Sequence, residues 1–391
     1  MNFMEFFSPV PGFLLPDRPN GDRLGDSIRY FGNVGAFPDL SNRPDLLLLG
    51  LGERKDGTVD NRYPDEIRKH LYTLYKGLYK PDLADAGNIR FEGLGEAGTE
   101  DDRIVEALSW AMNSAGLVIL LGHSQDYTWH IHEAYRRRNM YFNLCVIDAS
   151  LDMGDEAEEL DASNWLGKIL FNRLNKLFNV SLMGYQNYLV PPRLVQTFRD
   201  LHFDVVRLGD LRAQMEEAEP YLRDADVVSI DASSMQYSSC PAAREQWPNG
   251  LRGEELCRMA RYLGMSPKLT CAGVFNLDTD SPQFSLGASA MAQVVWHIID
   301  GFYARTVDNP DFSSSEYLSY EVAGDTESSS LRFYQNRISG RWWLRIPLPI
   351  DLQIQYNVPE FVVPCSEKDY LAATMNEVPE RWMNSLKKLN L

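Results

Sequence analysis

Two segments of the chain end apolar, strand-like runs with carboxylates. One is Cys145-Val-Ile-Asp148-Ala-Ser150-Leu-Asp152, and the other is Val227-Val-Ser-Ile-Asp231-Ala-Ser233. Carboxylate oxygens gathered at neighbouring strand ends are ligands that hard divalent cations prefer. Both segments have the pattern of a metal-binding strand end from which a ligand has been removed. The ancestry of the chain and its present chemistry are therefore separate questions.

Other strand-like and helix-like patterns alternate between about residues 45 and 305. Alternating β and α units predict a three-layer αβα fold with a mostly parallel, doubly wound sheet covered by helices on both faces. Several strands are continuous runs of Leu, Val and Ile, as expected when both faces are buried. The predicted strands are residues 46–51, 117–121, 144–148, 180–184, 203–208, 227–231 and 269–275, and the predicted helices are residues 64–79, 99–113, 129–138, 165–177, 253–263 and 288–303.

In parallel sheets, ligands bind in the crevice beyond the carboxyl ends of the strands. Asp148, Asp231 and Asn276 each stand at or just past such an end. We therefore expect these three side chains to share one crevice.

The last eighty or so residues differ in pattern. Residues 317–322, 331–336 and 341–346 alternate like short antiparallel strands, with loop-like segments at 309–315 and 325–330, and residues 379–389 form a candidate amphipathic helix. We divide the chain into a main domain, residues 1–309, and a small C-terminal β/α appendage, residues 310–391, packed on it.

Composition narrows the classes of function. The 391 residues suffice for one large domain or two ordinary ones, and 44% hydrophobic with 24% charged residues is typical of a soluble globular protein. A formal net charge of −17 disfavours nucleic acid and anionic membranes as partners. A small-molecule ligand remains compatible with this composition.

Cysteine usage and the absence of targeting signals predict a cytoplasmic location. The five cysteines are odd in number and form no CxxC pair, which argues against disulfides and zinc. The N-terminus has no basic region and its apolar run is broken by Glu5, so we expect no signal peptide. No apolar run is long enough to predict a transmembrane helix.

Four segments, those around Gln125, Asp148, Asp231 and Asn276, together resemble the ureohydrolase superfamily of arginase, agmatinase and formimidoylglutamase. The resemblance covers roughly residues 45–305 and is closest to the formimidoylglutamase-like members. The resemblance implies an arginase-like fold and a site in which two manganese ions activate a bridging hydroxide for hydrolysis of linear amidines. The family motifs are Gly-Gly-Asp-His-Ser, Asp-Ala-His-x-Asp and Ser-x-Asp-x-Asp. Further similar stretches are Gly50-Leu-Gly-Glu-Arg, Pro64-Asp-Glu-Ile-Arg68 and Pro248-Asn-Gly-Leu-Arg-Gly-Glu-Glu255.

Carried onto this chain, the resemblance leaves three of six ligand positions intact: Asp148, Asp152 and Asp231. The first motif appears as Gly122-His-Ser-Gln125-Asp, and we align Gln125 with the family histidine because it precedes Asp148 by the family interval. His123 is the alternative ligand. The other two ligand positions hold Ser150 and Ser233.

Two further positions of the family also depart from its pattern. The glutamate that binds the substrate's guanidinium in the family aligns with Asn276, and the proton-relay histidine aligns near Leu166. We therefore assign no catalytic residue. Serine hydroxyls are poor metal ligands, so the resemblance predicts either no cofactor or one divalent cation, manganese or magnesium, in place of a binuclear manganese centre.

Two functions follow from these losses. The first is a catalytically degenerate member of the superfamily, a pseudoenzyme that binds a small ligand or a partner. The second is a hydrolase of linear C–N bonds that uses one metal at Asp148, Asp152 and Asp231. The resemblance also implies a homo-oligomer.

Overall fold

The structure is a computed structural model that describes residues 3–14, 21–32, 42–55, 58–91, 99–154, 158–172, 174, 176–306, 314–323, 330–356 and 361–389. Most of the two loop-like segments predicted at 309–315 and 325–330 lies outside these residues, and so does the predicted domain boundary, which stays a prediction. None of the described helices is both long and apolar enough to cross a membrane.

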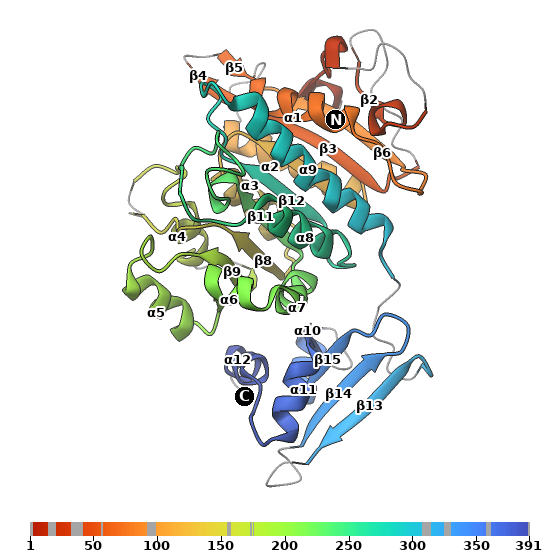
Figure 1. Ribbon diagram of the computed structural model, residues 1–391, viewed down its shortest axis with the longest axis vertical. Helices are drawn as coiled ribbons and strands as arrows, with labels where there is room; N and C mark the ends of the chain where they lie inside the picture. The colour runs from red at the N-terminus through yellow and green to blue at the C-terminus, as the bar shows by residue number, and fades with distance from the viewer. Residues whose placement is uncertain are drawn as a thin grey trace.

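Ten strands of the described residues form one sheet in the order β1-β6-β3-β7-β12-β11-β8-β9-β10, with β2 paired to β6 (Figure 1). Every pair is parallel except β1 with β6. The strands are β1 (Phe7–Ser8), β2 (Arg29–Tyr30), β3 (Leu46–Leu51), β6 (Leu83–Ile89), β7 (Leu117–Gly122), β8 (Phe142–Ile147), β9 (Leu177–Tyr185), β10 (Asp204–Arg207), β11 (Val227–Asp231) and β12 (Cys271–Phe275); β4 (Glu53–Lys55) and β5 (Thr58–Asp60) form a separate hairpin.

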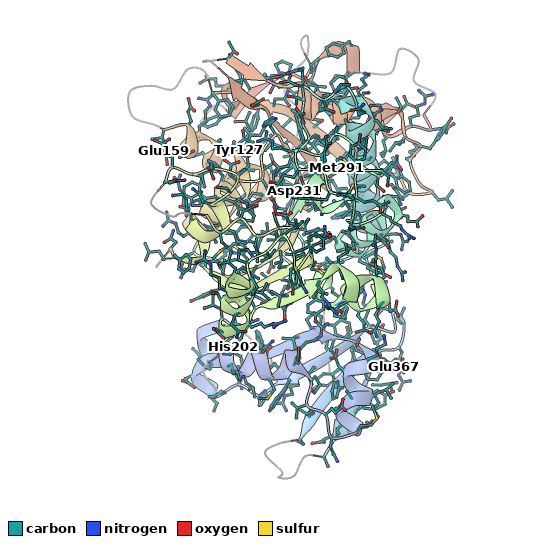
Figure 2. All side chains as sticks on the ribbon, turned by 60° about the vertical axis from the view of Figure 1, so that its left-hand side comes forward. Tyr127, Glu159, His202, Asp231, Met291 and Glu367 are labelled. Carbon is teal, nitrogen blue, oxygen red and sulfur yellow. The ribbon has the colours of Figure 1, made fainter. Side chains whose placement is uncertain are left out.

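Helices cover both faces of this sheet, and side chains fill the space between the layers (Figures 1 and 2). Alternation along β3 shows the two layers, because Leu46 and Leu48 join one buried cluster while Leu47 and Leu49 join the other. The helices are α1 (Arg62–Thr73), α2 (Glu100–Ser114), α3 (Tyr127–Arg137), α4 (Trp165–Leu170), α5 (Pro192–Asp200), α6 (Leu208–Ala213), α7 (Ala218–Asp224), α8 (Gly253–Gly264) and α9 (Phe284–Tyr303), with 3-10 turns η1 (Phe3–Phe6), η2 (Gly12–Leu14), η3 (Leu24–Asp26), η4 (Met215–Glu217) and η5 (Ala232–Ser234). The predicted αβα fold is thus confirmed.

Strand β6 was not predicted, because polar residues interrupt its apolar pattern. The structure shows that these residues surround a fully buried arginine, Arg68 of α1. Arg68 Nε and Nη2 donate to Asp85 Oδ2 and Oδ1 at 2.8 and 3.0 Å, and Nη1 donates to Asn88 Oδ1 at 2.5 Å. Tyr72 Oη donates to Asp85 Oδ2 at 2.6 Å. The buried Arg68 guanidinium and the buried Asp85 carboxylate therefore neutralise each other between α1 and β6.

The C-terminal segment contains an antiparallel sheet with strand order β13-β14-β15-β16, and helices of the same segment lie beside it (Figure 1). Leu331, Phe333, Trp342 and Leu344 belong to its own buried cluster. The elements are β13 (Tyr317–Val322), β14 (Leu331–Asn336), β15 (Trp342–Ile346), α10 (Ile350–Tyr356), β16 (Phe361–Cys365), α11 (Glu367–Thr374) and α12 (Glu380–Lys388).

A second buried arginine joins this sheet to the main domain. Arg223 of α7 donates through Nη2 to the carbonyl oxygens of Trp342 and Cys365, at 3.0 and 3.2 Å. Its guanidinium lies 4.5 Å from the ring centroid of Trp343, and its Nε lies 3.0 Å from Glu219 Oε1. The guanidinium thus binds backbone and ring of the appendage at once.

We expect Arg68→Met to lower the free energy of unfolding by about 3–5 kcal/mol, because it leaves the Asp85 carboxylate buried without its cation. Urea denaturation measures this. The control is Lys69→Met on the same helix, whose exposed pair with Glu66 contributes about 1 kcal/mol or less. Equal effects of the two substitutions would show that the buried pair carries no special weight.

Candidate crevice at the carboxyl ends of the strands

The predicted site residues come together at the carboxyl ends of four adjacent strands, β7, β12, β11 and β8. Asp231 is the last residue of β11, while Asp148 and Asn276 directly follow β8 and β12. Gln125 lies in the turn between β7 and α3. All four are buried, and Gln125 has no exposed surface.

Asp231 accepts hydrogen bonds on both carboxylate oxygens. Oδ1 accepts from the backbone N–H of Ser233 at 2.6 Å, and Oδ2 accepts from Asn276 Nδ2 at 2.5 Å. Asn276 Oδ1 in turn accepts from the backbone N–H of Gln125 at 3.1 Å. Asn276 has a φ of +69°, a conformation that asparagine tolerates better than most residues. Its amide is therefore committed to joining three strand ends.

The Gln125 side chain inserts between two carboxylates. Its amide nitrogen donates to Asp231 Oδ2 at 2.9 Å and to Asp152 Oδ2 at 3.1 Å, and its Oε1 accepts from Ser229 Oγ at 3.1 Å. We assign this orientation because the reverse would turn the amide oxygen toward the carboxylate oxygens.

A pair of buried hydroxyls lies beside this amide. Ser229 lies two residues before Asp231 on the same face of β11. Its Oγ is 2.8 Å from Thr128 Oγ1 of α3, and both residues are buried. With Ser229 donating to Gln125, the Thr128 hydroxyl supplies the hydrogen of the other bond. A polarised chain thus runs from Thr128 to the carboxylates.

The remaining aspartates rest on nearby donors. Asp148 Oδ1 accepts from the backbone N–H of Ser150 at 3.2 Å, and Asp152 Oδ2 accepts from Trp165 Nε1 at 2.9 Å. The carbonyl oxygen of Asp152 accepts from the backbone N–H of Leu166 at 3.2 Å. The Leu166 side chain is buried in the core, so it has no chemical role in the crevice.

Burial and mutual repulsion hold protons on these carboxylates. Burial is the main cause that raises the pKa of Asp152 to about 8 and that of Asp231 to about 6, and the Asp231 charge raises the pKa of Asp152 further. The pKa of Asp148 is also raised, by burial first and then by Asp231 and Asp152. Compared with carboxyls in water, the neutral protonated form of these side chains is therefore favoured.

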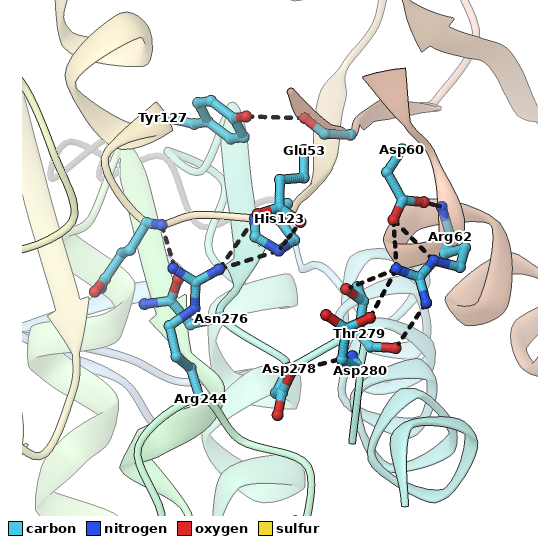
Figure 3. Close-up of polar contacts among 12 residues, drawn as sticks. Glu53, Asp60, Arg62, His123, Tyr127, Arg244, Asn276, Asp278, Thr279 and Asp280 are labelled. Carbon is cyan, nitrogen blue, oxygen red and sulfur yellow. Dashed lines mark hydrogen bonds and ion pairs between the residues drawn. The ribbon is translucent and has the colours of Figure 1, made fainter. Parts of the chain in front are cut away.

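His123 directly follows β7 and lies between two charged side chains (Figure 3). Its Nε2 is 3.2 Å from Glu53 Oε2 and 3.0 Å from Arg244 Nη2. Arg244 is exposed, and its backbone N–H donates to the carbonyl oxygen of Asn276 at 2.9 Å. Nearby, Arg62 bridges Asp60 and Asp280, at 2.7 and 3.0 Å.

Sequence reasoning missed Glu53 and Arg244. No sequence motif marks Arg244. An isolated β-bridge between Ala243 and Leu277 brings the loop that carries Arg244 beside the end of β12. Ser229 was visible in the third motif, but its partner Thr128 is apparent only once the fold places α3 against β11. The Ser233 hydroxyl accepts from the backbone N–H of Glu245 at 3.1 Å, which ties the same loop to the crevice.

The donor set does not fit a divalent cation. Neutral Gln125 and the hydroxyls of Ser150 and Ser233 stand at three of the six ligand positions, and the Asn276 amide N–H occupies one lone pair of Asp231. In the part of the chain that the structure describes, no group of three or more His, Cys, Asp or Glu side chains is placed to hold a metal ion.

Comparison with known proteins places the chain in a family. A model of the Arginase family matches residues 55–300, and the chain therefore belongs to the arginase family. The predicted relationship to the ureohydrolases is thereby confirmed. No curated protein matches the chain.

Solved structures of similar fold agree with this assignment. Formiminoglutamase of Trypanosoma cruzi, solved with Mn²⁺, shares 16% identity with a TM-score of 0.59, covering 68% of this chain and 95% of its own. Formimidoylglutamase of Bacillus subtilis shares 14% identity with a TM-score of 0.60, covering 74% and 95%. Agmatine ureohydrolase of Thermoplasma volcanium shares 16% identity with a TM-score of 0.52, covering 69% and 94%. At these identities the likeness shows the fold alone.

The raised pKa values predict that stability falls as pH rises from 6 to 8. The folded protein binds these protons more tightly than the unfolded chain, so unfolding releases them, and each such group contributes a slope of at most about −1.4 kcal/mol per pH unit. Asp152→Asn removes one titration but keeps an oxygen acceptor for Trp165, and it should flatten the slope in urea denaturation across this range. The control is Asp200→Asn at an exposed position. Identical slopes for the two variants would contradict the protonated cluster.

Proposed function

We propose that this chain is a non-hydrolytic member of the arginase family that acts by binding and holds no catalytic metal. The observation that carries the proposal is the position of the Gln125 amide, whose nitrogen in the assigned orientation lies 2.9 Å from Asp231 Oδ2 and 3.1 Å from Asp152 Oδ2. A neutral donor at this position, beside the hydroxyls of Ser229 and Thr128, satisfies the carboxylates without an ion.

Substrate recognition of the family type is also missing. A carboxylate that gathers a cationic amidine would stand at Asn276, which carries no charge and whose amide is spent on Asp231 and Gln125. A proton relay would need a titratable side chain near Leu166, which is a core residue. These two positions therefore offer no side chain that binds the cationic group or transfers a proton to the leaving amine.

What remains is a group of charged side chains near the strand ends. Arg244 is exposed beside His123, which also contacts Glu53, and the Arg244 backbone bonds to Asn276, so a ligand at the surface meets a guanidinium there. These groups suit a small polar ligand or a loop of a partner protein. The competing function, hydrolysis through one divalent cation on Asp148, Asp152 and Asp231, requires Gln125 to turn its amide away.

Calorimetric titration of chelator-treated protein with Mn²⁺ at neutral pH should give no saturable heat up to millimolar metal, because Gln125, Ser150 and Ser233 stand at three of the six ligand positions. Assays with formiminoglutamate, agmatine and arginine should show no metal-dependent turnover. Saturable binding of one equivalent together with turnover would establish the single-metal hydrolase instead.

The triple variant Gln125→His/Ser150→His/Ser233→Asp should bind Mn²⁺ measurably, because it restores the family's ligand types on a scaffold of the same fold. The control is Gln125→Asn/Ser150→Thr/Ser233→Thr, which alters the same positions without adding metal ligands. Catalysis is not expected to return, since Asn276 and Leu166 are unchanged. A folded triple variant that binds no metal would show that the alignment of these positions is wrong.

A further inference from the structure

The two edge strands of the C-terminal sheet lie in different surroundings. At one edge, β16 is covered by the main domain, where Arg223 donates to the carbonyl oxygen of Cys365. At the other edge, β13 has β14 as its one strand neighbour among the described residues, and Figure 1 shows it outermost, away from the main domain. The second edge is the one open to a further strand.

The hydrogen-bond pattern identifies which backbone groups of β13 face outward. Arg337 N–H donates to the carbonyl oxygen of Glu316, the pair that continues the β13–β14 register by one step. Pairing alternates along an antiparallel ladder, so Leu318, Tyr320 and Val322 bond to β14. Ser319 and Glu321 then present their N–H and C=O groups away from β14.

The outer edge lacks the usual protection against pairing. The strand Tyr317–Val322 is six residues long and contains no proline, lysine or arginine. Its single charge, Glu321, is balanced on its own sheet by Arg332 at 3.5 Å and by a bond from Ser330 Oγ at 3.1 Å. The described residues outside the ladder make no backbone hydrogen bond to Ser319 or Glu321.

We propose that β13 of two copies of this chain pair antiparallel across a two-fold axis, joining the two C-terminal sheets into one continuous sheet. Tyr317 is less available for this pairing, because its N–H already donates to the carbonyl oxygen of Ser314 at 3.2 Å. We therefore choose the register in which each Ser319 exchanges hydrogen bonds with the partner's Glu321. Tyr320 then lies opposite the partner's Tyr320 at the axis. This pairing does not depend on whether the crevice binds metal.

Side chains on both faces suit this register. On the core face, Leu318 lies opposite the partner's Val322, so half-buried apolar residues meet apolar residues. Tyr320 is already held rigid, with its ring 5.1 Å from those of Trp342 and Tyr370. On the other face, an uncharged serine meets each glutamate, and like charges are kept apart. The strand is therefore complementary to itself, which identifies a second copy as the occupant over an unrelated peptide.

Sedimentation velocity on the full-length chain, over a range of concentrations, should show a monomer–dimer equilibrium. Ser319→Glu opposes like charges at two symmetric positions and should raise the dimer dissociation constant by between about twofold and thirtyfold. The matched variant Ser319→Lys places a cation opposite the partner's Glu321 and should leave the dimer as tight or tighter. Thermal unfolding of each monomer checks that both variants fold, since Ser319 is exposed.

Ser319→Pro gives a second route to the same test. It removes one outward N–H without touching the β14 ladder, and proline is tolerated on an edge strand, so the monomer should fold while the dimer is lost. A chain that stays monomeric up to its solubility limit overturns the proposal. A dimer that responds equally to Ser319→Glu and Ser319→Lys, or survives Ser319→Pro, also overturns it, because its interface then lies elsewhere.

Discussion

A buried carboxylate must be balanced by a cation, by hydrogen-bond donors or by a proton. The structure at the carboxyl ends of these strands depends on which of the three is present. Asp148, Asp152 and Asp231 stand close together at the ends of strands whose order fixes their positions. Left ionised and alone they would repel each other at a cost the fold could not offset. In this structure the Asn276 amide and, in its assigned orientation, the Gln125 amide donate to Asp231, while burial raises the pKa of all three carboxyls. The same elements that could gather a metal thus form a cross-linked end to the sheet.

The same principle recurs in two other places. Arg68 satisfies Asp85 beneath the first helix, and Arg223 joins the C-terminal sheet to the main domain. In each case one buried guanidinium uses several of its donors on a neighbouring element, which fixes geometry more firmly than apolar contact alone. The acidic protein thus places selected cations inside while its net charge of −17 stays mostly at the surface.

The sequence allowed prediction of the main sheet and most of its helices, because apolar runs such as residues 46–51 and 117–121 leave little alternative. It could not reveal β6, where Asp85 and Asn88 break the apolar pattern and make sense only beside buried Arg68. In the crevice, the spacing from Gln125 to Asp148 brought the right residues together. The direction of the Gln125 amide and the approach of Arg244 depend on packing between distant segments, which no local pattern encodes.

The central claim is that an amide replaces the cation between Asp152 and Asp231. Anomalous diffraction from crystals soaked in Mn²⁺, recorded at neutral pH, tests this most directly. The account predicts no anomalous peak among the three aspartates, with the Gln125 side chain still within hydrogen-bond distance of both carboxylates. A peak coordinated by Asp148, Asp152 and Asp231, with the amide turned away, would contradict it and restore the metal centre to this member of the arginase family.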